Sequence, residues 1–349
     1  MTLGVSEAQS PEGGGLPADH LADTAEAKQI EGRSLGQIAL ARLKKDKIAI
    51  ISALLILLIV AVAIFAPLIV KLNGFPPDQF NKTDSDGNPL LNTRDGGIPI
   101  GGLWGSGTSS EHWLGVEPQN GRDVFSRLVY GTRVSLLVAL GGTVIAIVIG
   151  TVVGMVSGYF RGWVDTLLSR LMDIMLSFPT LLFVMALTPV IASRGQDLFG
   201  IPDDNALRMG VLMFVLGFFG WAYLARIVRG QVLSLREREF VEAARSLGAG
   251  PIYVIFRQIL PNLIPTLLVY TTLLIPGNIT AEAALSFLGV GIKEPTASWG
   301  RMIADASDWI ESNPLYLFFP GLALFITVLA FNLLGDSVRD ALDPRAGRS

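Results

Sequence analysis

Apolar residues along this chain gather into long runs that polar segments separate. A bilayer core about 30 Å thick is crossed by about 20 mostly apolar helical residues, and six runs reach that length. We expect membrane-spanning helices at residues 48–70, 134–158, 171–192, 209–225, 259–288 and 316–335. The third run is the least regular, because Asp173 lies inside it and Pro179 should kink it. The pattern predicts an all-α protein that crosses a membrane six times.

The basic residues between these runs predict the orientation of the chain. If the N-terminus is cytoplasmic, the inner segments hold 17 Lys and Arg in 106 residues and the outer segments hold 10 in 106. Short cytoplasmic loops carry the excess of Lys and Arg in membrane proteins. Residues 226–258 alone carry six arginines. We therefore expect both termini in the cytoplasm, as an even number of spans requires.

The segments between the runs suggest four parts. Residues 1–33 are rich in Gly, Ala and acidic residues without an apolar period, which predicts a disordered cytoplasmic tail. Residues 34–73 hold the first span and act as an anchor. Residues 74–133 form an extracytoplasmic loop rich in turn-forming residues. Residues 134–349 hold the other five spans.

Composition supports a membrane protein and excludes several kinds of site. The chain is 50% hydrophobic and 16% charged, with a mean hydropathy of +0.51, whereas soluble domains are about 25% charged. It has no cysteine and only two histidines, far apart in sequence, which excludes thiolate, disulfide and multi-histidine metal chemistry. The net charge of -3 gives no attraction to nucleic acid. No Gly-Lys pair is present, so the chain has no P-loop with which to bind nucleotide phosphates.

The loop before the fifth run is not simply polar. Phe240, Val241, Ala244 and Leu247 follow a helical period, and Gly248 should end that helix at positive φ. Pro251 suits the first turn of a second helix, which continues through Ile259-Leu260-Pro261 into the fifth run. Two short amphipathic helices with a glycine corner could dock into a groove of a cytoplasmic partner. The same pattern also fits a helix pair that lies on the membrane surface.

Within this loop, Glu242-Ala243-Ala244, Gly248 and Ile259-Leu260-Pro261 resemble the EAA loop of bacterial ABC importer permeases. Other parts of the chain resemble the C-type permeases of dipeptide, oligopeptide and nickel importers, in the same order. These parts are Phe65-Ala66-Pro67-Leu68-Ile69, His112-Trp113-Leu114-Gly115, Gly121-Arg122-Asp123-Val124-Phe125, Leu285-Ser286-Phe287-Leu288-Gly289 and Asp340-Ala341-Leu342-Asp343-Pro344-Arg345. The resemblance runs from about residue 34 to residue 345.

The resemblance implies a non-catalytic permease subunit with a five-helix core after the anchor helix, in the bacterial inner membrane. It would import short peptides, or alternatively nickel chelates or haem. Its partners would be a second homologous permease in a heterodimer, one or two cytoplasmic ATPase subunits, an extracytoplasmic substrate-binding protein and membrane lipid. ATP and Mg would be bound by the ATPase subunits, and this chain would bind no cofactor. The residues implied to couple to the ATPase are Glu242, Ala243, Ala244, Ser246, Leu247, Gly248, Ala249 and Gly250, with Ile259, Leu260 and Pro261 at the junction with the fifth span.

Two acidic residues lie at membrane depth. A charge there costs about 3 kcal/mol on insertion scales, so Glu282 and Asp173 should face protein. For Glu282 we weigh an ion pair or packing hydrogen bond, a substrate contact and a coupling-ion site, in that order. For Asp173, packing or a cytoplasmic gate is favoured over substrate binding. A coupling ion at Glu282 would fit the alternative hypothesis, a secondary transporter driven by an ion gradient. A membrane-anchored enzyme is disfavoured, because no nucleophile, base and metal ligands occur together.

Overall fold

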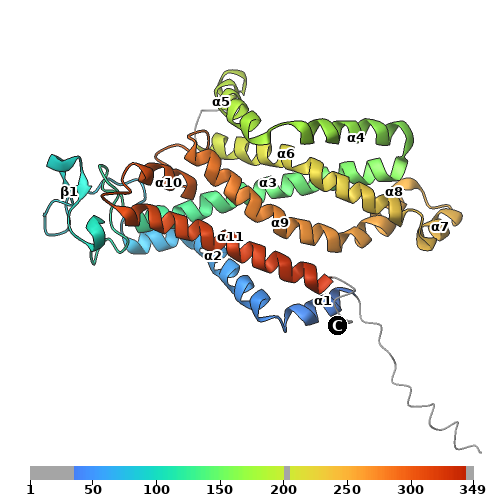
Figure 1. Ribbon diagram of the computed structural model, residues 1–349, viewed down its shortest axis with the longest axis horizontal. Helices are drawn as coiled ribbons and strands as arrows, with labels where there is room; N and C mark the ends of the chain where they lie inside the picture. The colour runs from blue at the N-terminus through green and yellow to red at the C-terminus, as the bar shows by residue number, and fades with distance from the viewer. Residues whose placement is uncertain (1–34, 200–204, 343–349) are drawn as a thin grey trace, which may run out of the picture.

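The computed structural model describes residues 35–199 and 205–342, so the tail expected at residues 1–33 lies outside the described residues. The longer helices are α1 (Leu35–Leu43), α2 (Lys47–Asn73), α3 (Val124–Phe160), α4 (Gly162–Ser177), α5 (Thr180–Phe199), α6 (Asn205–Leu235), α7 (Glu239–Ser246), α9 (Leu260–Phe287), α10 (Trp299–Ser307) and α11 (Pro314–Leu342). The short elements are β1 (Leu91–Asn92), β2 (Ile98–Pro99), the 3₁₀ turns η2 (Thr93–Asp95) and η3 (Leu103–Gly105), α8 (Pro251–Tyr253) and the π-helical turn η4 (Val254–Ile259). The long helices run side by side along the longest axis of the molecule (Figure 1).

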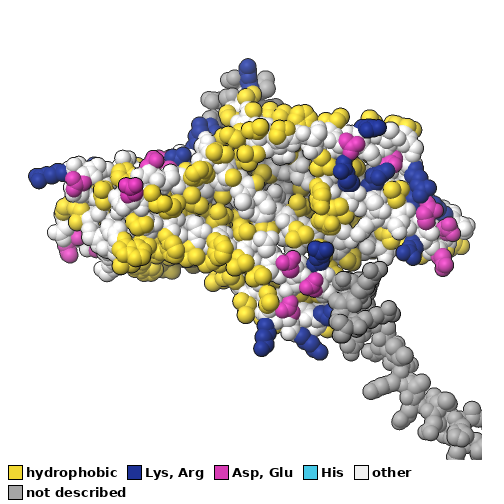
Figure 2. Space-filling view, in the orientation of Figure 1, with side chains coloured by type: hydrophobic (Ala, Val, Ile, Leu, Met, Phe, Trp, Pro, Cys, Tyr) yellow, Lys and Arg dark blue, Asp and Glu magenta, His cyan; other side chains and the backbone are white. Residues whose placement is uncertain are grey.

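Within the described residues, five helices are long and apolar enough to span a membrane, namely α2, α3, α6, the continuous stretch Pro251–Phe287 and α11. The pair α4 and α5 makes a sixth if it counts as one span. Hydrophobic side chains cover much of the middle of the visible face, whereas charged side chains gather toward both ends (Figure 2). This distribution is that of a helical bundle that crosses a membrane, and it confirms the predicted fold class.

The third span differs from the prediction of one helix over residues 171–192. The helix begins earlier, at Gly162, and breaks between α4 and α5 with a bend of 88°. The cause is Pro179, because a proline disfavours helical geometry in the residue before it. Phe178 accordingly adopts an extended backbone with φ -75° and ψ 135°. Where a kink was expected, the chain turns through nearly a right angle.

The second span is also longer than predicted. Helix α3 has 37 residues and begins at Val124 instead of residue 134, so at 1.5 Å per residue it is about 55 Å long. Asp123 caps its N-terminus by accepting a hydrogen bond from the Ser126 N–H at 2.8 Å. The other carboxylate oxygen of Asp123 contacts Nδ1 of buried His112 at 2.8 Å. The outer end of α3 is therefore fixed by groups that precede it in the sequence.

The segment before α3, which is predicted to be extracytoplasmic, folds into a small subdomain at one end of the bundle (Figure 1). We call it the outer subdomain after that prediction. It contains a two-stranded antiparallel ribbon in which Leu91 pairs with Pro99 and Asn92 with Ile98. Leu90, Leu91 and Val116 form its small apolar core. This loop of turn-forming residues is thus ordered, although its strands are only two residues long.

Helices α3 and α6 form the centre of the bundle, and small residues let them approach closely. A Cβ atom at Gly154 would lie 2.6 Å from the carbonyl oxygen of Ala225, and one at Gly150 would lie 2.9 Å from that of Trp221. Small residues serve the same purpose in other membrane helix pairs. Helices α4 and α5 lie on one side of α6, and α9, α11 and α2 lie on the other (Figure 1).

Candidate functional site

The segment 239–261 lies at the end of the bundle opposite the outer subdomain (Figure 1). Its first helix, α7, carries Glu239 and Glu242 in the first turn and Arg245 in the last, an order that favours the helix dipole. The Gly248 N–H donates to the Arg245 carbonyl at 2.9 Å and the Ala249 N–H to the Ala244 carbonyl at 3.0 Å. These two bonds are the Schellman pattern of a helix end. Gly248 has φ +86°, so the predicted glycine corner is confirmed.

The second half of the segment is continuous with the fifth span. Pro251 occupies the first turn of α8, and the chain then passes through η4 into α9. The Leu260 N–H donates to the Ile255 carbonyl, five residues back. Ile259 is buried, whereas Pro261 is exposed in the first turn of α9. The corner is therefore connected to a membrane-spanning helix without a flexible loop.

The apolar residues of this segment divide between two faces. Val241, Val254, Ile255 and Ile259 are buried in a cluster with residues of α3, α6 and α9. Arg245 lies over the ring of Tyr159 at 5.1 Å. The opposite face, which we call the tip surface, consists of the exposed side chains Phe240, Leu247, Ile252, Tyr253 and Phe256.

The predicted stripe of α7 is therefore only partly right. Val241 is fully buried, but Leu247 is 88% exposed. The reason is that Leu247 lies seven residues after Phe240 on the same helical face, which is exposed, whereas Val241 lies about 100° around the helix on the buried side. In the second stripe, Ile255 and Ile259 point inward while Ile252 is 74% exposed. Periodicity found the apolar residues but did not separate the two faces.

A groove of about 550 Å³ opens at this corner. Its lining residues are Phe240, Ala243, Ala244, Leu247, Gly248, Ala249, Gly250, Tyr253 and Gln258. Small residues form much of it, so a partner can approach the backbone closely. Glu242 and Ser246 are exposed beside it, and within residues 35–199 and 205–342 the Glu242 carboxylate has no hydrogen bond or ion pair. The structure thus brings the eight predicted coupling residues together at one exposed corner.

Glu282 lies in a different place, near the outer end of α9, and is fully buried. The Ser286 hydroxyl donates to its carboxylate at 2.7 Å, and the hydroxyls of Ser135 and Ser298 also contact it. Each of these serine oxygens also accepts a backbone N–H. The Ser286 oxygen accepts from Ile292, the Ser135 oxygen from Trp299 and the Ser298 oxygen from Arg301. Glu282 therefore ties α9 to α3 and α10 through hydroxyl groups.

Asp173 lies on α4 and is half exposed. Arg226 of α6 donates to its carboxylate at 2.5 Å. About two turns earlier, Asp165 accepts from the Arg229 guanidinium at 2.5 and 2.7 Å. These ion pairs hold the bent span against α6, which is the packing role weighed for Asp173.

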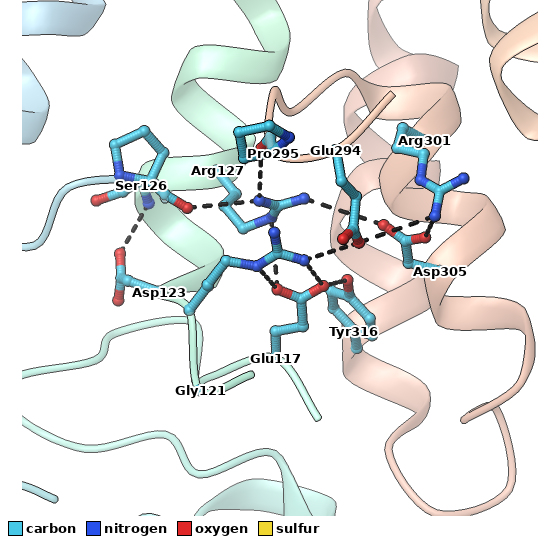
Figure 3. A network of polar contacts seen from close by, with 12 residues as sticks. Glu117, Gly121, Asp123, Ser126, Arg127, Glu294, Pro295, Arg301, Asp305 and Tyr316 are labelled. Carbon is cyan, nitrogen blue, oxygen red and sulfur yellow. Dashed lines mark hydrogen bonds and ion pairs between the residues drawn. The ribbon is translucent and has the colours of Figure 1, made fainter. Parts of the chain in front are cut away.

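A second polar cluster, not predicted from the sequence, lies where the outer subdomain meets the helices (Figure 3). At its centre is Glu117, which is buried and accepts from Arg122 through both the Nε and the Nη2 atoms, the latter at 2.8 Å. The Tyr316 hydroxyl donates to the same carboxylate at 2.7 Å. Arg122 also reaches Glu294 at 2.9 Å. We call this set, with Arg127, Arg301 and Asp305, the outer cluster.

Within the outer cluster, three carboxylates lie within 4.8 Å of one another: Glu117, Glu294 and Asp305. Three arginines balance their charge, and Arg301 pairs with Asp305 at 2.6 Å. Burial raises the pKa of Asp305 to about 6, opposed by Arg301 and assisted by the nearby carboxylates of Glu117 and Glu294. Because these arginines already neutralise the carboxylates, the cluster serves to connect the outer subdomain to α10 and α11. In the sequence, the only sign of this cluster was the regular spacing of three of its charged residues, Glu117, Arg122 and Arg127, which lie five residues apart.

Comparison with known proteins adds family evidence to this geometry. Residues 150–348 match the family described as binding-protein-dependent transport system inner membrane component. Residues 34–91 match the N-terminal transmembrane domain of oligopeptide transport permease C.

Two curated relatives extend this match along the chain. The dipeptide transport system permease protein of Alkalihalophilus pseudofirmus is 36% identical over 307 residues, 88% of this chain and 89% of that protein. The oligopeptide transport system permease protein of Haemophilus influenzae is 36% identical over 327 residues, 94% of each chain. Among solved structures, an inward-facing methionine ABC transporter aligns with a TM-score of 0.50 and 20% identity, covering 63% of this chain and 97% of that one. At 20% identity, the similarity to this solved structure supports the fold alone.

Proposed function

Because this chain belongs to the family of binding-protein-dependent transport system inner membrane components, we propose that it is a transmembrane permease subunit of an ATP-driven importer of short peptides. The observation that carries this proposal is the match to dipeptide and oligopeptide permeases at 36% identity over most of the chain. The bundle of apolar helices fits a subunit that forms part of a path across the inner membrane of a bacterium.

The tip surface and its groove are the proposed contact with a cytoplasmic ATPase subunit. Exposed Leu247, Ile252 and Phe256 would stay in water without a partner. The Schellman corner and the unbroken passage from α8 into α9 make the contact rigid, so that a movement of the ATPase would move a membrane-spanning helix. Glu242 is free to pair with a basic group of the partner.

The sequence has no P-loop, so we propose that nucleotide binding and hydrolysis occur on other subunits. ATP and Mg are assigned to the ATPase subunits, and a second homologous permease supplies the other half of the path. A substrate-binding protein delivers peptide to the outer subdomain. ATP binding draws the two coupling segments together and opens the path outward, and hydrolysis returns it to the inward-facing state. In this arrangement both termini are cytoplasmic.

The proposal is tested with the assembled complex in proteoliposomes. Uptake of a radiolabelled tripeptide should require ATP and loaded binding protein and should stop with vanadate. This chain without its partners should neither hydrolyse ATP nor transport. Uptake that continues with vanadate and without ATP would instead support the ion-gradient transporter. A binding protein that retains only a nickel chelate or haem would exclude the peptide substrate.

The docking contact has its own test at the tip surface. Leu247→Asp and Glu242→Lys should release the ATPase subunits from the purified complex, because each adds an unfavourable charge to the contact. Ile100→Asp, at an exposed apolar position in the outer subdomain, is the control and should leave them bound. Retention of the ATPase by both tip variants would show that the segment lies on the membrane surface instead.

A further inference from the structure

A pocket of about 420 Å³ lies at the outer end of α3, outside the coupling segment and the outer cluster. We call it the outer pocket. One wall is the turn at Pro77 and Asp78, and another is the loop at Thr296 and Ala297. Its floor comes from α3 and from the start of α6, with the lining residues Tyr130, Arg133, Val134, Leu137 and Met209.

Hydrogen bonds hold both walls in place. The fully buried Arg127 donates to the Pro77 carbonyl at 3.4 Å and to the Pro295 carbonyl at 3.2 Å. Asn205, the first residue of α6, donates to the Thr296 hydroxyl at 3.0 Å and accepts the Lys293 N–H at 3.1 Å. The outer pocket is therefore formed before any ligand arrives.

The outer pocket presents one cation and one anion. Arg133 and Asp78 both line it. In the parts of the chain that the structure describes, neither side chain makes a hydrogen bond or an ion pair with another residue. A guanidinium binds phosphate oxygens with paired hydrogen bonds, and a carboxylate binds an ammonium group. The charges fit a ligand that carries both a phosphate and an amine.

Below the outer pocket, α3 presents an exposed apolar stripe. Leu137, Val144, Val148 and Val152 are between 44% and 59% exposed. Their spacing of seven, four and four residues places them on one helical face, and Arg133 and Tyr130 continue that face outward. The stripe contains only Val and Leu among its exposed residues, whereas close helix contacts in membranes favour Gly, Ala and Ser. An acyl chain is the occupant that this face fits.

We propose that the outer pocket binds an aminophospholipid of the outer leaflet, with its phosphate on Arg133, its ammonium group toward Asp78 and an acyl chain along the α3 stripe. Arg133 lies where the polar outer segment gives way to the apolar span, which is the level of lipid headgroups. An arginine at that level is stabilised by reaching a headgroup. The proposal depends only on a membrane location and not on which solute is transported.

The chain has no cysteine, so single reporters can be introduced cleanly. The complex carrying Val144→Cys labelled with bimane is reconstituted with brominated phosphatidylethanolamine or brominated phosphatidylglycerol. Quenching at position 144 should show a preference of about fivefold for the ethanolamine lipid, the size expected for partly exposed ion pairs. Leu58→Cys on the exposed face of α2 reports bulk lipid and should show a ratio near one.

Three variants separate the contributions. Arg133→Gln should lower quenching at position 144 by both lipids toward that at position 58, because both lipids carry a phosphate. Asp78→Asn should bring the ratio of ethanolamine to glycerol quenching at position 144 to that at position 58. Lys71→Gln, an exposed cation in the last turn of α2, is the matched control and should change nothing. A ratio near one in the unmodified complex, or quenching by both lipids that Arg133→Gln leaves unchanged, would overturn the proposal. Absence of quenching by either lipid at position 144 would also overturn it, because a protein partner would then cover the stripe.

Discussion

At the scale of single residues, Gly248 sets the direction of the coupling segment. Its φ of +86° is strained for any residue with a Cβ, although the surrounding space is open. Gly248→Val should therefore cost on the order of 1–3 kcal/mol and turn the tip surface. We expect membrane insertion to survive, while stimulation of the ATPase by loaded binding protein is lost, as measured by phosphate release from the reconstituted complex.

The matched control for this substitution is two residues away. Gly250 has φ -70°, and a Cβ there meets nothing within 4 Å. Gly250→Val should keep more of the coupling than Gly248→Val. Equal loss in both variants would mean that bulk, and not backbone strain, decides the effect.

Asp305 in the outer cluster should give the complex a measurable pH dependence. Its pKa is about 6 in the folded protein and ordinarily 3.8, so the folded state holds this proton more tightly than the unfolded chain. The contribution of Asp305 to stability is therefore present below pH 4 and is lost as pH rises to 6. The stability of the Asp305→Asn variant, compared with that of the unmodified protein, should therefore be higher at pH 7.5 than at pH 4.5.

The measurement is the melting temperature of the purified complex at both pH values. The melting temperature of the variant minus that of the unmodified protein should rise by about 2–4 °C from the lower to the higher pH. The nearby variant Asp308→Asn changes an exposed carboxylate after α10 and should show no such rise. A difference for Asp305→Asn that stays constant with pH would contradict the raised pKa.

At the scale of elements, the break between α4 and α5 depends on one proline. Pro179→Ala restores a backbone N–H and frees Phe178 to become helical, so the 88° bend should open. Spin labels on exposed positions Thr166 and Ala186 should then lie farther apart by double electron–electron resonance. Pro189→Ala, at a second proline inside α5, is the control and should leave that distance nearly unchanged. A constant distance in Pro179→Ala would show that the contacts with α6 impose the bend.

At the scale of the whole molecule, the orientation remains a prediction from the basic loops. Ser246, the last residue of α7, and Ser109 in the outer subdomain are both exposed. Helix α7 and the outer subdomain lie at opposite ends of the bundle (Figure 1). In intact cells whose outer layers are permeable to the reagent, a membrane-impermeant maleimide should label Ser109→Cys and not Ser246→Cys. After the inner membrane is permeabilised, both should react. Labelling of position 246 alone in intact cells would invert the topology.

The sequence by itself determined the fold class and the approximate positions of the spans, because about 20 consecutive apolar residues must leave water as a helix. It also placed the glycine corner, since local backbone geometry restricts positive φ to few residue types. Motifs spaced along the chain identified the family. Each of these features depends on neighbours in the sequence.

Only the tertiary structure decided which residues far apart in sequence meet. It joined Glu117 to Tyr316 across 199 positions and surrounded Glu282 with serines from three elements. It turned Leu247 outward while burying Val241, and it set the walls of the outer pocket through Arg127. The physical reason is that burial and charge pairing depend on the packing of whole helices, which hydrophobic periodicity along one helix does not record.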